Sequence, residues 1–230
     1  FRNHPRYGFM FENATVGGDT MAEVVGHLFR IPANGTPMTI MQLAGFPAEV
    51  VDSVVSVLSR MAFDFGLWSD GASPLLFVCE EAHRYVPNEK NADGSSVAKI
   101  LSRIAKEGRK YGISLGLITQ RPSDLAEGVL SQCGTIISMR LNNERDQAFV
   151  KAAMPEGARG FLDSIPALRN RECIISGEGV PAPIRVRLDE LEAAKRPMSD
   201  DPVFSELWVK TGDDSDMLNR VIARWRANAR

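Results

Sequence analysis

The sequence predicts an α/β domain with a mostly parallel sheet and helices on both faces, followed by further strands and a helix at the C-terminal end. Two observations carry this prediction. Short, nearly continuous apolar runs recur along the chain, and stretches with apolar residues at helical spacing lie between them. This alternation is typical of strand–helix–strand units, because a parallel strand is buried on both faces and needs a crossover helix to reach its neighbour.

The composition is that of an ordinary globular chain. The 230 residues have a net charge of -2 and are 44% hydrophobic, so a sizeable core is expected and any contact with nucleic acid must be local. No apolar run is long enough to cross a bilayer and no signal segment opens the chain, which favours a cytoplasmic protein with no membrane association. Cys79, Cys133 and Cys173 lie far apart in apolar segments. We therefore expect free thiols and neither a disulfide nor a zinc site.

The individual elements follow from the apolar spacing. A buried strand is predicted at residues 38–43, and a helix follows from Val50 to Met61. Three further strand–helix pairs are expected: residues 75–79 with 95–110, 114–119 with 123–131, and 135–139 with 144–153. Residues 172–176 and 184–188 are predicted to pair antiparallel, because a link of about seven residues is too short for a helical crossover.

The chain ends are assigned from weaker patterns. Gly17 to Thr20 predicts a turn, residues 21–30 a short helix, and residues 217–225 part of a C-terminal helix with one apolar face. We expect residues 1–190 to form one domain and residues 191–230 to form a linker and helical extension.

The segment Leu75 to His83 carries the chemistry that the sequence indicates. An apolar strand ends there in Glu80 and Glu81, which places two carboxylates at the strand's carboxyl end, the edge where ligands bind in open α/β sheets. Glu80 can hold a magnesium ion with its water, and Glu81 can orient and deprotonate an attacking water, as in the Walker B pattern of nucleotide hydrolases. Alternatively, the two acids simply begin a loop or cap the next helix.

Two later segments narrow this interpretation. The motif Glu80-Glu81-Ala82-His83, followed by residues 105–112 (Ala-Lys-Glu-Gly-Arg-Lys-Tyr-Gly) and residues 117–123 (Leu-Ile-Thr-Gln-Arg-Pro-Ser), resembles the HerA branch of the HerA/FtsK motor ATPases. The likeness covers about residues 36 to 190. It implies a RecA-like P-loop NTPase fold, ATP with Mg²⁺, a homo-hexameric ring, movement on double-stranded DNA, and a possible NurA-like nuclease partner.

Candidate site residues outside the acidic strand come from the same motifs. Gln120 ends the neighbouring strand; it either senses the γ-phosphate or its water, as the resemblance implies, or hydrogen-bonds loop backbone. Arg121 either binds phosphate or forms a salt bridge. The resemblance makes Arg109 the first choice for an arginine finger acting on the neighbouring subunit and Arg103 the second. Lys99, Arg103, Lys106 and Lys110 share one helix face, which is either simply solvated or directed at DNA phosphates. Weaker candidates are His83, which either touches the nucleotide or serves local hydrogen bonding, and Asn142 and Asn143, which lie at the ligand edge. Arg185 and Arg187 either reach towards the nucleotide, as the resemblance implies, or are solvated on a surface strand.

A phosphate-binding loop is the missing part of this site. The Walker A pattern needs a Gly-Lys pair, and the sequence contains none. We expect the loop upstream of Phe1, or else a degenerate paralogue, and in either case little ATPase activity from these 230 residues alone. Two alternatives to a DNA translocase remain: a non-hydrolysing RecA-like scaffold or regulatory module, and an ATPase that moves protein or single-stranded DNA in secretion or conjugation.

Overall fold

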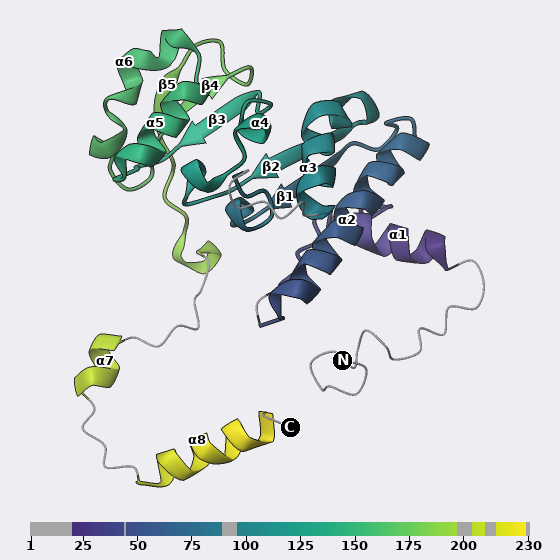
Figure 1. Ribbon diagram of the computed structural model, residues 1–230, viewed down its shortest axis with the longest axis vertical. Coiled ribbons are helices and arrows are strands. Elements are labelled where there is room, and N and C mark those ends of the chain that lie inside the picture. The colour runs from purple at the N-terminus through teal and green to yellow at the C-terminus, as the bar shows by residue number, and fades with distance from the viewer. Residues whose placement is uncertain (1–19, 44, 89–95, 197–203, 210–214, 229–230) are drawn as a thin grey trace. The chain divides into compact units, whose positions relative to one another are not determined.

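The computed structural model describes residues 20–43, 45–88, 96–196, 204–209 and 215–228 (Figure 1). The chain divides into two compact units: residues 41–190, and residues 1–40 together with 191–230. The predicted domain of residues 1–190 with its 191–230 extension remains a prediction. Most of the predicted turn at residues 17–20 lies outside the described residues.

The larger unit begins with helix α2 (Ala48–Trp68), which confirms the helix predicted from Val50 to Met61. Pro47 precedes its first turn, where a missing backbone N–H costs nothing. The helix buries one face along its length, including Val51, Val55 and Phe63. Its valines are tolerated because tertiary burial outweighs their weak helix propensity.

Strands β1 (Leu75–Cys79) and β2 (Ile113–Leu117) pair in parallel, with Leu75 opposite Ile113 and Cys79 opposite Leu117. Helix α3 (Ser96–Glu107) and the 3₁₀ turn η4 (Gly108–Tyr111) belong to the connection between them. This arrangement confirms the predicted α/β class with a parallel pair at its centre.

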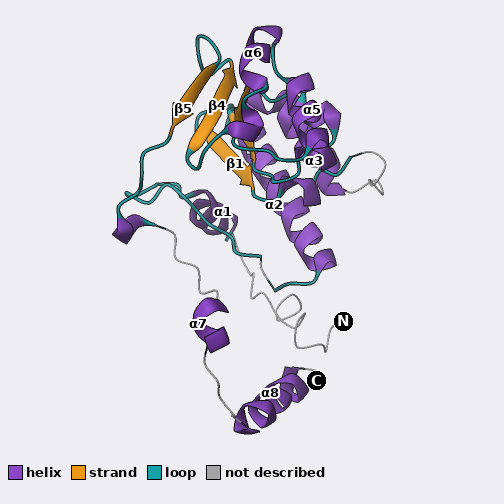
Figure 2. Cartoon of the chain, turned by 90° about the vertical axis from the view of Figure 1, so that its left-hand side faces the viewer, coloured by secondary structure: helices purple, strands orange, loops and turns teal. Residues whose placement is uncertain are grey.

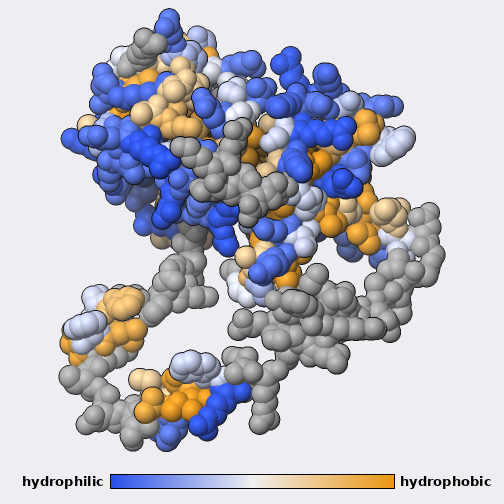
Figure 3. Space-filling model, viewed as in Figure 1, coloured by the Kyte–Doolittle hydropathy of each residue, from blue (hydrophilic) through white to orange (hydrophobic). Residues whose placement is uncertain are grey.

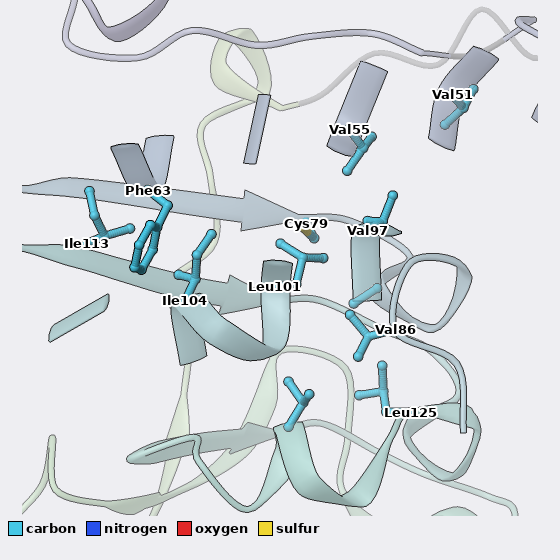
Figure 4. Close-up of a cluster of buried hydrophobic side chains, with 12 residues drawn as sticks. Val51, Val55, Phe63, Cys79, Val86, Val97, Leu101, Ile104, Ile113 and Leu125 are labelled. Atoms are coloured by element: carbon cyan, nitrogen blue, oxygen red, sulfur yellow. The ribbon is translucent and has the colours of Figure 1, made fainter. Parts of the chain in front are cut away.

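The core between these elements is shown in Figure 4, where side chains from α2, α3 and both strands meet. Phe63, Leu101 and Ile113 are almost completely buried. The opposite face of the strand pair differs, because the side chains of Leu76 and Val78 are 63% and 49% exposed. Among the described residues, helices therefore cover one face of β1 and β2 and not the two that were expected.

A three-stranded antiparallel sheet completes this unit: β3 (Thr135–Ser138), β4 (Glu172–Gly177) and β5 (Ile184–Arg187), in that order. Helices α5 (Glu144–Ala153) and α6 (Arg159–Leu162) lie along one face of it (Figure 2). The predicted antiparallel pairing of β4 with β5 is confirmed. Strand β3 was expected in the parallel series, but it pairs antiparallel with β4.

Two predicted elements are wrong. Residues 38–43 form no strand, and Met38 and Ile40 are 71% and 83% exposed, because among the described residues no neighbouring strand pairs with this segment. The helix predicted at residues 123–131 is broken into η5 (Pro122–Asp124) and α4 (Glu127–Leu130). The break arises because Ala126 donates its N–H to the carbonyl of Val86 and Asp124 accepts from the N–H of Asn88, so this backbone pairs with residues 86–88 instead of with its own turn.

The smaller unit contains α1 (Met21–Phe29), which confirms the predicted first helix, and α7 (Phe204–Val209), which was not predicted. Its helix α8 (Ser215–Asn228) confirms the C-terminal helix. The apolar face of α8 is exposed, with Trp225 at 74%, and its orange side chains are visible in Figure 3.

The three cysteines are free thiols, as predicted. None of the described helices is long and apolar enough to span a membrane.

Candidate active site

The carboxyl ends of β1 and β2 bring the two most informative motifs together. Backbone pairing continues beyond the strands, because Ile118 donates its N–H to the carbonyl of Cys79 and Ala82 donates to the carbonyl of Ile118, each over 2.9 Å. Glu80-Glu81 and Thr119-Gln120 therefore leave the sheet side by side. The sequence predicted this proximity from the order of the strands alone.

Glu81 has an unusual backbone conformation. Its φ of 50° and ψ of 46° lie in the left-handed region, at the start of the 3₁₀ turn η2 (Ala82–Arg84). A residue with a Cβ pays roughly 1–3 kcal/mol for such a conformation, which persists only where the surroundings hold it. Backbone strain of this kind is concentrated at functional sites.

Both carboxylate oxygens of Glu81 have a partner. Gln120 donates from Nε2 to Oε1 over 2.9 Å, and Nδ1 of His83 lies 3.4 Å from Oε2. The same Nδ1 lies 3.0 Å from Oγ1 of Thr119, which also accepts the backbone N–H of Arg121. The side chain of Glu81 is 42% exposed, so a ligand can still reach it from solvent.

Glu80 points towards solvent beside this network. The described residues contain no cluster of three or more His, Cys, Asp or Glu side chains able to enclose a metal ion. Magnesium does not require one, since it usually keeps several waters and binds one or two carboxylates together with substrate phosphates. Glu80 and Glu81, which are consecutive in the sequence, offer the one or two carboxylates that such partial coordination uses.

A cavity of about 380 Å³ adjoins Gln120. The residues that line it are Gln120, Arg121, Ser123, Asp124, Asn143, Arg145 and Asp146. Its two walls are joined by a buried contact, in which Ser123 donates its backbone N–H to Oδ1 of Asp146 over 3.0 Å. Arg121 is 70% exposed and only loosely paired with Asp124, at 3.9 Å between Nη1 and Oδ2.

The structure adds Arg145 to this cavity, a residue that the sequence analysis missed. Asn143 caps helix α5 by accepting the backbone N–H of Arg145 on its Oδ1 atom over 2.9 Å. The signal was available, because Arg145 follows two residues after an asparagine that was already placed at the ligand edge. Asn142 is exposed just before this cap.

Two predicted arginines lie away from the acidic residues. The guanidinium of Arg103 sits 4.3 Å from the centroid of the Phe63 ring, and its Nε donates to Oε2 of Glu107 over 3.3 Å. Arg109 belongs to η4, whose following residue Gly112 accepts the N–H of Leu75 and so lies at the amino ends of both strands. A strand of five residues is about 16 Å long. Arg109 therefore stands at the opposite end of the strand pair from Glu81.

The weaker candidates on β5 are also separate from the network. Arg185 donates from Nη2 to Oε2 of Glu172 over 2.7 Å. The backbone N–H of Arg169 and the Arg185 guanidinium together hold the pKa of Glu172 below its ordinary value of 4.5. Arg185 thus forms a structural ion pair across the β4–β5 ladder, and Arg187 is exposed.

Comparison with known proteins finds similarity to helicases, most of them described as HerA. The sequence family described as the central domain of helicase HerA matches residues 2–62. A DNA double-strand break repair helicase HerA from Pyrococcus furiosus is 40% identical over 117 residues, covering 51% of this chain and 21% of the relative. A probable helicase from Methanocaldococcus jannaschii is 31% identical over 187 residues, covering 79% of this chain and 36% of the relative.

A HerA helicase from Saccharolobus solfataricus is 28% identical over 216 residues, 94% of this chain and 42% of the relative. The chain thus spans less than half the length of these curated relatives. Among solved structures, the genome packaging NTPase B204 from Sulfolobus turreted icosahedral virus 2 has a TM-score of 0.47 and 17% identity, covering 61% of this chain and 63% of that one.

Proposed function

Since this chain belongs to the HerA-type motor ATPases, we propose that it carries the acidic half of an ATP-hydrolysing site in a DNA translocase. The observation that supports this most strongly is the hydrogen bond between Gln120 and Glu81, which joins the two family motifs at the carboxyl edge of the sheet. A phosphate-binding loop outside these 230 residues would supply the other half.

The residues then have separate tasks. Glu80 would hold Mg²⁺ together with its waters, and the ion would supply positive charge to neutralise the phosphates of ATP. Glu81 orients the attacking water and accepts its proton. Gln120 contacts the γ-phosphate or that water with its amide, and Arg121 lies beside the same phosphates, at the mouth of the adjoining cavity.

Arg109 acts only between subunits in this account. Its place at the amino end of β2 separates it from Glu81 in the same chain, whereas a ring of identical subunits can present it to a neighbour's nucleotide. We extend the proposal accordingly to a homo-hexamer that encircles double-stranded DNA, with a NurA-like nuclease as a possible partner. Arg103 is a weaker candidate, because Phe63 and Glu107 already engage its guanidinium.

The test is ATP turnover by the full-length protein with and without duplex DNA. We expect duplex DNA to stimulate turnover, and Glu81→Gln to reduce kcat by roughly a hundredfold or more while nucleotide binding persists. The matched control is Glu178→Gln, which changes an exposed carboxylate in the turn after β4. Stimulation by single-stranded DNA alone would indicate that the protein moves on single strands and not on duplex DNA. Unchanged turnover in Glu81→Gln would refute the assignment of Glu81 as the base.

A further inference from the structure

His83 closes a ring of contacts around the carboxylate of Glu81. One side of the ring is the bond from Gln120 Nε2 to Glu81 Oε1, at 2.9 Å. The other side runs from Glu81 Oε2 to His83 Nδ1, at 3.4 Å, and from Nδ1 to Thr119 Oγ1, at 3.0 Å. Thr119 and Gln120 are consecutive, so the backbone completes the ring.

The chemistry of the ring determines which atom carries the proton. An ionised carboxylate can only accept a hydrogen bond, so Nδ1 of His83 must donate if its contact with Glu81 is to be attractive. Thr119 Oγ1 can accept from the same N–H and from the backbone N–H of Arg121. An unprotonated Nδ1 would instead direct a lone pair at the carboxylate. An attractive contact between Nδ1 and Glu81 therefore needs the Nδ1–H form of the ring, whereas the contact with Thr119 alone is compatible with either form.

His83 is better placed to act on Glu81 than on a nucleotide. Its side chain is 21% exposed, half the value for Glu81, and it lies in η2 with its Nδ1 turned towards the strand ends. When a glutamate must hold a water at a fixed position, the reaction slows if the orientation of its carboxylate is not maintained. The backbone of Glu81 lies in the left-handed region, a conformation that only the surrounding contacts maintain.

We propose that His83 is a positioning residue that fixes the orientation of the Glu81 carboxylate through Nδ1–H, with Thr119 holding the imidazole ring in place. This inference rests on the proposed role of Glu81 as the base. It assigns His83 no contact with ATP.

The geometry can be tested on the present chain without any catalysis. Nitrogen-15 NMR of the imidazole should show a protonated Nδ1 in His83 of the wild type, and the signature should shift in Glu81→Gln and in Thr119→Val. An unprotonated Nδ1 in the wild type would overturn the proposal. Because this measurement needs no turnover, it remains decisive even if the full-length protein proves not to hydrolyse ATP, the result that would refute the proposed function.

The kinetic test uses the full-length protein. Loss of a group that orients a residue in contact with the reacting groups typically lowers activity about ten- to a hundredfold. His83→Ala should therefore lower kcat by roughly that factor and leave KM for ATP within about twofold. His83→Asn should recover most of the rate, because its amide N–H can occupy nearly the position of Nδ1–H. His27→Ala, at an exposed histidine of α1, is the control.

Two outcomes would contradict the proposal in this assay. One is a kcat of His83→Ala equal to that of the wild type. The other is an equal loss of rate in His83→Asn and His83→Ala with unchanged thermal unfolding, which would mean that the donor position is irrelevant. In a Glu81→Gln background the His83→Ala change should cost nothing further, since the residue it positions is already disabled.

Discussion

The side-chain amide of Gln120 donates a hydrogen bond of 2.9 Å from Nε2 to Oε1 of Glu81, joining residues 39 positions apart in sequence. Each residue follows one of two parallel strands that are neighbours in the sheet. If ATP binds here as proposed, a phosphate oxygen that accepts a hydrogen bond from the Gln120 amide would release the Glu81 carboxylate.

Arg103 is predicted to act in stability and not in nucleotide binding. Replacing it with alanine removes the cation–π contact with Phe63, worth about 0.5–1 kcal/mol, and an exposed i,i+4 ion pair worth about 0.3–0.5 kcal/mol. Thermal unfolding of Arg103→Ala should therefore occur at a lower temperature, while ATP affinity of the full-length protein is unchanged. Lys106→Gln, on the exposed face of the same helix, should alter neither quantity. A selective loss of ATP affinity would restore the role predicted from the sequence.

Arg109 is predicted to work only on a neighbouring subunit. Full-length Arg109→Gln and Glu81→Gln should each be nearly inactive alone, because every interface lacks either the finger or the base. Mixed oligomers of the two variants contain interfaces with one wild-type Arg109 and one wild-type Glu81, so mixing should regenerate turnover. If activity after mixing and subunit exchange only equals the sum of the activities of the two separate variants, Arg109 does not act in trans.

Glu172 is expected to make the stability of the fold sensitive to acid. Its pKa is lowered in the folded chain, chiefly by the backbone N–H of Arg169 and then by Arg185, from an ordinary value of 4.5. A lowered folded-state pKa stabilises the fold above the unfolded pKa, and this stability is lost as the pH falls through the folded value. Between about pH 5 and pH 3, the unfolding temperature of the wild type should thus fall more steeply than that of Glu172→Gln. Glu178→Gln should follow the wild type; identical slopes for wild type and Glu172→Gln would contradict the linkage.

Cys79 should be nearly inert in the folded protein. Burial raises the pKa of its thiol to about 11, and burial also raises the pKa of Cys133, which is less deeply enclosed. Since the thiolate is the reactive form, alkylation by iodoacetamide at about pH 8 should modify Cys133 before Cys79 and should be slow at both. In denaturant both should react quickly. Mass spectrometry of timed digests measures this order, and early modification of native Cys79 would contradict the burial of its thiol at the end of β1.

The acidic site was largely predictable because its parts are local. An apolar strand that ends in two carboxylates and a second strand that ends in Thr-Gln place Glu81 and Gln120 at one edge once the strands are parallel. The contact of Arg103 with Phe63 was not predictable, because it depends on how α2 packs against α3. Residues 38–43 form no strand despite their apolar run, since such a run forms a strand only if a neighbouring backbone is present to pair with it.

The break in the helix predicted at residues 123–131 has a similar cause. Ala126 and Val86 form a backbone hydrogen bond although they lie far apart in the sequence, and the spacing of apolar residues along the chain does not predict such a contact. From the sequence, His83 could either contact the nucleotide or form local hydrogen bonds, and its two oxygen partners, on Glu81 and Thr119, became apparent only from the geometry.

The most direct test of the central claim is a double-mutant cycle between Glu81 and Gln120 on ATP turnover. The measurement compares kcat of the full-length wild type, Glu81→Gln, Gln120→Leu and the double variant, with thermal unfolding recorded for each. If the two residues form one hydrolytic unit, their effects are not additive, and the double variant turns over about as slowly as Glu81→Gln alone. Fully additive losses, or an unchanged kcat in Glu81→Gln, would show that the paired ends of β1 and β2 are not the site of hydrolysis.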